Sequence, residues 1–71
     1  MKKIYKVGIG YWDVPPLEDR FVLASSRSDA LRWAEEQVSP LDKEIGHYHI
    51  SADIATEYDL FWIDPENVPE V

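Results

Sequence analysis

Carboxylates are the side chains of this protein that could do the most chemistry, and they are unevenly distributed. Residues 44–71 carry seven acids and no Lys or Arg, whereas residues 1–43 carry seven acids and seven bases, so the formal net charge of −7 belongs to the C-terminal part. Carboxylates this exposed rarely have the shifted pKa values that general acid–base catalysis requires. A one-sided negative field attracts basic surfaces and repels nucleic acid and anionic lipid. The sequence therefore predicts binding to a basic protein rather than catalysis.

Three of these acids fall on one face of a predicted strand. Between residues 47 and 63 the chain alternates, and Asp53, Glu57 and Asp59 all occupy odd positions. Alternate residues of a strand lie about 6.7 Å apart, which is comparable to the spacing of successive phosphates in a nucleic-acid strand. The pattern predicts an acidic array that mimics DNA, and the alternative is a solvated outer face that only maintains solubility. The predicted partner-binding residues are Glu44, Asp53, Glu57, Asp59, Asp64 and Glu66.

A pair of histidines offers a second chemistry. His47 and His49 fall on the same face of the alternating segment, and an H-x-H pair on a strand can bind zinc when a third ligand approaches. Asp53 lies further along that face, but two ligands and a distant carboxylate are weak evidence for a metal site. The alternative is two exposed polar residues, and we expect no bound metal.

The sequence gives little evidence for a catalytic nucleophile or a phosphate-binding loop. Ser25, Ser26 and Ser28 stand where a helix begins and are better explained as caps and turn residues. The Gly8-Ile9-Gly10 segment lacks the third glycine and the following helix of a phosphate-binding loop. We therefore expect no enzymatic activity and no cofactor.

The bulk composition predicts one small domain in a reducing compartment. A chain of 71 residues is one domain, and a domain of this size buries only about 60% of its unfolded surface. The absence of Cys rules out disulfides and fits the cytoplasm. The segment Ile4–Trp12 alternates and contains Lys6 and two glycines, so we expect neither a secretory signal nor a transmembrane span.

Hydrophobic periodicity predicts the elements that would position these residues. Residues 2–12 read as a strand, residues 13–19 as a loop that contains two prolines, and residues 20–24 as a second strand, antiparallel to the first. Residues 26–38 read as the one good helix, with Ser26 or Ser28 as its cap. The residues expected to be largely buried are Val7, Ile9, Phe21, Leu23, Leu31, Ala34, Ile50, Tyr58, Leu60 and Trp62.

The C-terminal part reads as a connector over residues 41–46 followed by one or two strands. The alternation between Tyr48 and Trp62 never changes phase, so it fits either one long bent strand or two strands joined near residues 53–56. Two strands are favoured because mean strands are short. The predicted fold is α+β, with one helix on a three- or four-stranded, mainly antiparallel sheet in β-β-α-β-β order. The predicted domain covers residues 1–64, and residues 65–71 form a flexible acidic tail.

The size, acidity, lack of Cys and element order resemble those of the small phage-encoded anti-CRISPR proteins that mimic DNA. The resemblance rests on the helix at 26–38 and the acid-only stretch Glu44–Glu70. In similar inhibitors of type I surveillance complexes, acidic side chains occupy the Lys/Arg track that would hold target DNA. The resemblance implies an inhibitor that acts in the host cytoplasm as a monomer or small homo-oligomer and blocks DNA recruitment.

A second resemblance involves the step from strand to helix. The segment Phe21–Val38 (FVLASSRSDALRWAEEQV) looks like the corresponding step of small HicB-like antitoxins, with Ser-x-x-x-Ala-Leu at the helix start. That resemblance implies a regulatory subunit that neutralises a basic RNase-type toxin. A structural module of a phage particle or larger complex is the third alternative.

Overall fold

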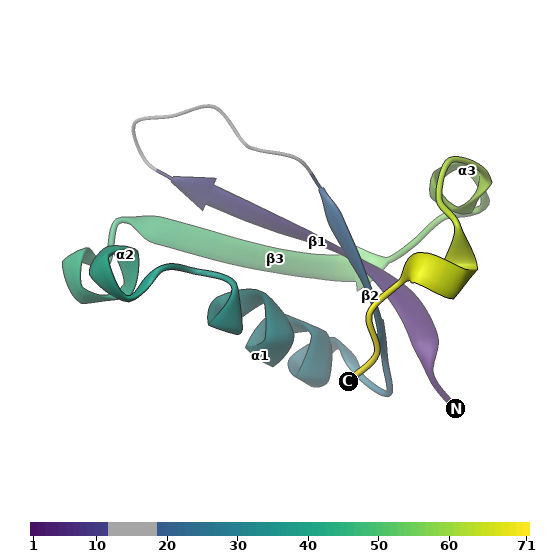
Figure 1. Ribbon diagram of the computed structural model, residues 1–71, viewed down its shortest axis with the longest axis horizontal. Coiled ribbons are helices and arrows are strands. Elements are labelled where there is room, and N and C mark those ends of the chain that lie inside the picture. Colours follow the sequence, from purple (N-terminus) through teal and green to yellow (C-terminus); the bar gives the residue numbers. More distant parts are fainter. Residues whose placement is uncertain (12–18) are drawn as a thin grey trace.

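A computed structural model describes residues 1–11 and 19–71, and it shows one helix packed across a three-stranded sheet (Figure 1). The three strands are β1 (Lys3–Tyr11), β2 (Arg20–Ala24) and β3 (Tyr48–Ile54). They lie in the order β2-β1-β3, and both pairs are antiparallel. The predicted α+β class and antiparallel sheet are confirmed, whereas the single helix and the β-β-α-β-β order are wrong. The predicted loop at 13–19 falls mostly on residues 12–18, outside the described part. The elements are β1 (Lys3–Tyr11), β2 (Arg20–Ala24), α1 (Arg27–Glu36), α2 (Pro40–Ile45), β3 (Tyr48–Ile54), α3 (Glu57–Phe61) and a 3-10 turn, η1 (Pro65–Asn67).

The central strand β1 forms as its alternation predicts. Tyr5, Val7 and Ile9 are buried, because alternate side chains of a strand point to the same face and α1 covers that face. The register pairs Tyr5 with Val22 on one side and Val7 with Ala52 on the other. These pairs lie on the α1 side of the sheet. Val22 of β2 and Ala52 of β3 are therefore buried together with the β1 residues with which they pair.

The predicted buried face of β2 is wrong. Val22 and Ala24 are fully buried, whereas Phe21 and Leu23, which were expected in the core, are only half-buried. All four side chains are apolar, so the segment itself does not distinguish its two faces. The register with β1 makes the choice, because Phe21 lies opposite Lys6 on the face away from α1.

Helix α1 packs closely on the sheet because its inner face is made of small residues. Ala30 and Ala34 are fully buried and face the sheet, where Ala52 of β3 is also fully buried. The predicted cap is confirmed, since the Ser26 hydroxyl accepts a hydrogen bond from the Asp29 amide at 3.2 Å. Leu31 is only half-buried and packs at the margin of this cluster.

The connector expected at residues 41–46 is a second helix, α2. Ser39 caps it by accepting from the Asp42 amide at 3.2 Å, and Pro40 occupies the first turn, where its missing N–H costs nothing. Gly46 ends it in the left-handed conformation at φ 76°. Each of these signals is present in the sequence, but the helix is short and buries no residue.

The long alternation after residue 47 does not form one strand or a hairpin. Strand β3 ends at Ile54, and α3 begins after Thr56. The Thr56 hydroxyl accepts from the Asp59 amide at 3.2 Å, and the Asp59 carboxylate accepts from the Thr56 amide at 3.0 Å. This reciprocal capping box starts a helix where the side-chain pattern suggested a strand. Tyr58, Leu60 and Trp62, which were expected in the core, are therefore exposed.

The segment expected to be a tail makes specific contacts with β2 and with Lys2, which precedes β1. The Leu23 amide donates to the Pro69 carbonyl at 2.8 Å, and the Val71 amide donates to the Leu23 carbonyl at 2.9 Å. Lys2 also pairs with Glu70 at 2.6 Å. Residues 69–71 thus cover part of the outer edge of β2, which would otherwise expose unpaired backbone groups.

A small core makes the fold sensitive to the loss of a single buried side chain. Val7 and Val22 are the largest fully buried side chains among the described residues. We expect Val22→Ala to lower the free energy of unfolding by about 2 to 3 kcal/mol, from lost burial and the cavity it leaves. The matched control is Leu41→Ala on α2, where the side chain is 65% exposed. Urea unfolding of both variants is the measurement, and equal losses would contradict this description of the core.

Candidate functional site

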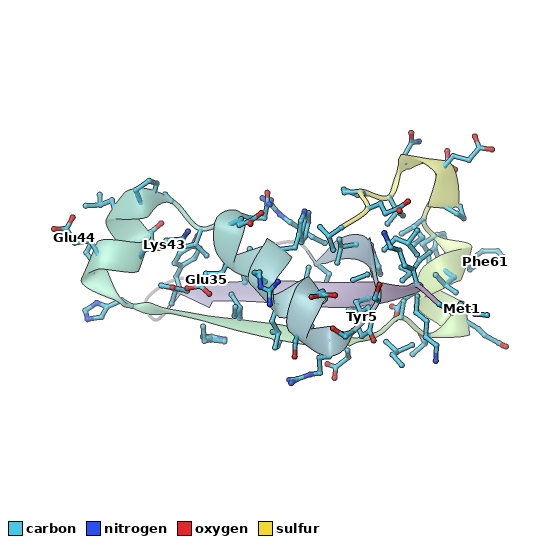
Figure 2. The ribbon with its side chains drawn as sticks, turned by 90° about the horizontal axis from the view of Figure 1, so that it is seen from below. Met1, Tyr5, Glu35, Lys43, Glu44 and Phe61 are labelled. Carbon is cyan, nitrogen blue, oxygen red and sulfur yellow. The ribbon has the colours of Figure 1, made fainter. Side chains whose placement is uncertain are left out.

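The acids predicted to form one strand-borne array come from several different elements. Asp53 lies on β3, Glu57 and Asp59 on α3, and Asp64 and Glu66 at η1. The predicted spacing along a single strand face is therefore wrong, because the chain turns into a helix after Ile54. Glu44 lies on α2 at the opposite end of the molecule from α3, and the molecule is 34 Å long (Figures 1 and 2). We call the end formed by α3 and η1 the acidic end, and its acids are Asp53, Glu57, Asp59, Asp64 and Glu66.

Asp59 holds the start of α3 in place. Its carboxylate accepts from the Thr56 amide at 3.0 Å and from the Thr56 hydroxyl at 2.8 Å, and it lies 3.6 Å from the Lys6 ammonium. These hydrogen bonds, first that of the Thr56 amide, hold the pKa of Asp59 below its ordinary value of 3.8. Asp59, a predicted partner-binding residue, thus stabilises local structure, and its side chain is only 15% exposed.

Lysines from the N-terminal strand lie among the acids of the C-terminal part. Lys6 lies 3.5 Å from Asp19 and 3.6 Å from Asp59, and these two carboxylates, Asp19 first, raise its pKa. Lys2 pairs with Glu70. Lys6 and Asp59, like Lys2 and Glu70, are far apart in the sequence, so charges that are separate in the sequence partly cancel in space. Sequence reasoning missed these ion pairs because they depend on tertiary contacts.

The remaining carboxylates of the acidic end differ in the contacts that they make. Asp53, Glu57 and Glu66 are exposed and form no ion pair with any other residue that the structure describes. Asp64 accepts from the Glu66 amide at 3.1 Å and from the Asn67 side chain at 2.9 Å. The acidic end therefore presents negative charge on short, capped elements.

Three aromatic side chains project from the same end of the molecule. Tyr58, Phe61 and Trp62 are 73%, 78% and 69% exposed, and Figure 2 shows Phe61 pointing outward at the tip. The Trp62 ring lies 6.2 Å from that of Tyr58 and 5.2 Å from that of Phe61, both edge to face. We call these three residues the aromatic cluster. The sequence signal that could have revealed this cluster is the Thr56-x-x-Asp59 capping box. It indicates that a helix, and not a strand, begins after Thr56.

An open groove runs between β2, α1 and the C-terminal segment. Its volume is about 500 Å³. Its wall includes Arg20, which donates to the Gln37 side chain at 3.4 Å. The groove could receive an apolar side chain, since most of its lining is apolar. Its apolar residues are Phe21, Trp33, Ile63, Val68 and Pro69.

His47 and His49 belong to no metal-binding group among the residues that the structure describes. His47 lies just before β3 and is exposed. The His49 ring lies against Gly10, where an added Cβ would come within 2.4 Å of it. No group of three or more His, Cys, Asp or Glu side chains in the described part is placed to hold a metal ion. Within residues 1–11 and 19–71, no helix is both long and apolar enough to cross a membrane.

The fold and this surface define a small α+β protein with exposed aromatic and acidic side chains at one end. No family model, curated protein or solved structure matches the chain.

The lowered pKa of Asp59 makes stability depend on pH. A carboxyl whose pKa is lower in the folded state stabilises the fold above its unfolded pKa, and that contribution is lost as the pH falls through the folded pKa. We expect Asp59→Asn to be less stable than wild type at neutral pH, and the difference to shrink as the pH falls below 3.8. Urea unfolding across this range is the measurement. Asp53→Asn is the control, and an equal response of the two variants would contradict the role given to Asp59.

Proposed function

We propose that this protein is a non-enzymatic inhibitor that binds a basic nucleic-acid-handling protein and keeps nucleic acid away from it. The observation that carries the proposal is a set of three exposed carboxylates at one end of a chain with net charge −7. These carboxylates, Asp53, Glu57 and Glu66, form no ion pair with any residue in the described part of the chain. Surfaces that bind nucleic acid are rich in Lys and Arg that contact phosphates. Carboxylates on a folded surface compete for those same side chains.

Ion pairing inside the protein neutralises some of its acids and leaves others without a partner among the described residues. Lys6 is held between Asp19 and Asp59, and Lys2 is held by Glu70. Each pair cancels positive against negative charge, so the negative charge left for a basic partner belongs to the acids that form no ion pair within residues 1–11 and 19–71. At the acidic end these are Asp53, Glu57 and Glu66, which do not lie on one strand with phosphate-like spacing.

Two kinds of basic partner fit this chemistry. The first is a type I surveillance complex, whose target-DNA track is lined by Lys and Arg. The second is an RNase-type toxin, for which the chain would be the antitoxin. The step from β2 through the Ser26 cap into α1, which resembles that of HicB-like antitoxins, favours this second candidate. Both partners would be engaged in the cytoplasm through the same acidic end.

The test reverses charge at the acidic end and, separately, elsewhere. One variant carries Asp53→Lys, Glu57→Lys and Glu66→Lys, and the matched control carries Glu35→Lys, Glu36→Lys and Glu44→Lys. All six residues are exposed acids, so both variants change the net charge equally.

Wild-type protein is expected to displace labelled double-stranded DNA from a purified surveillance complex, or to block RNA cleavage by a purified RNase-type toxin. The acidic-end variant should lose at least about tenfold in affinity, because close charge pairs across an interface are lost. The control should lose much less, and wild-type binding should weaken steeply with salt. If the two variants lost affinity equally, net charge alone would explain binding and the proposed surface would be wrong.

A further inference from the structure

We propose that the aromatic cluster on α3 is the anchor for an arginine side chain of the basic partner. This inference rests on the proposed function and adds a defined contact to it. A guanidinium that lies over an aromatic ring is attracted by the ring's electron density, and the planar group also stacks on the ring. The acids around the cluster would then pair with the outer edge of the same guanidinium or with its neighbours.

The first observation behind the inference is the exposure of the three rings. Tyr58, Phe61 and Trp62 leave most of their surface in solvent, although large aromatic side chains normally bury most of theirs. The chain has only a small core, and it leaves three of its largest side chains out of that core. Exposed Trp and Tyr that become buried on binding are the residues most often found to dominate interface energies.

The second observation is that the rings are held in a fixed arrangement. Tyr58 and Trp62 are one helical turn apart and meet at an interplanar angle of 66°, and Phe61 meets Trp62 at 80°. The capping box between Thr56 and Asp59 fixes the start of the short helix that carries them. The ring contacts and the helix cap both favour this arrangement in the free protein, and a preorganised arrangement lowers the entropy cost of binding.

The third observation is the charge around the cluster, which selects the occupant. Glu57 lies one turn before Phe61 on α3, and Asp64 follows Trp62 by two residues. Aromatic faces beside carboxylates favour a cation with a flat surface, and Arg offers both properties whereas Lys offers a compact, strongly hydrated charge. A second copy of the chain is disfavoured because it brings a net charge of −7 and the same carboxylates to the contact.

The experiment compares two labelled peptides of equal length and charge, an oligo-arginine and an oligo-lysine. Binding to the full chain is measured by fluorescence anisotropy at physiological salt. We expect wild type to bind the arginine peptide roughly tenfold more tightly than the lysine peptide, and Trp62→Leu with Phe61→Leu to remove that preference. Leucine keeps the apolar character of the sites and removes the rings. NMR should show a shift of the Trp62 indole N–H with the arginine peptide.

The matched control is Leu41→Ala with Ile45→Ala on α2. These side chains form the other exposed apolar pair on a short helix, at the opposite end of the molecule (Figure 1). The control should keep the preference for arginine. Circular dichroism and thermal unfolding establish that each variant is folded, and either single leucine substitution can replace the double one.

The outcomes separate the inference from the proposed function. Equal binding of the two peptides, or an arginine preference that survives loss of the rings, would overturn the inference while the acidic end could still bind both peptides. Self-association of wild type that the leucine variant lacks would also overturn it, because the occupant would be a second copy. If reversing Asp53, Glu57 and Glu66 left binding of both peptides unchanged, the proposed function itself would fail.

Discussion

The central position of β1 is the constraint on which the rest of this structure depends. It pairs with β2 on one side and with β3 on the other, so its register determines which face of each neighbour is buried. Tyr5 and Val7 lie on the α1 face, and they bring Val22 and Ala52 to the same side. The same strand carries Lys6 into the acidic part of the chain, so one pairing pattern organises both the core and the charge.

The core that results is built from small residues, and this has consequences for the surface. Helix α1 lies against the sheet through Ala30 and Ala34, which permits a close approach but leaves little volume to fill. The larger apolar side chains of α2 and α3 find no place in it. In α3 these side chains become the aromatic cluster, and the fold therefore exposes the residues that best suit a binding contact.

The carboxylates of the acidic end have two different roles. Asp59 and Asp64 accept hydrogen bonds from backbone amides at the starts of α3 and η1. Asp53, Glu57 and Glu66 are exposed and form no ion pair among the residues that the structure describes. The hydrogen bonds of Asp59 and Asp64 cap the two short elements that carry Glu57, Glu66 and the aromatic cluster.

Local sequence determined the elements whose signals are short-range. The alternation of β1, the Ser26 cap of α1 and the antiparallel step from β1 to β2 follow from periodicity and capping chemistry, which act within a few residues. Tertiary structure decided the buried face of β2, because all four of its apolar side chains are suitable and only the register with Tyr5 selects Val22. It also decided the site. The alternation of apolar and polar residues continues beyond Ile54, but the Thr56 and Asp59 cap starts a helix where the strand ends. The acids that were predicted to form one array therefore lie on several elements, beside exposed aromatic rings.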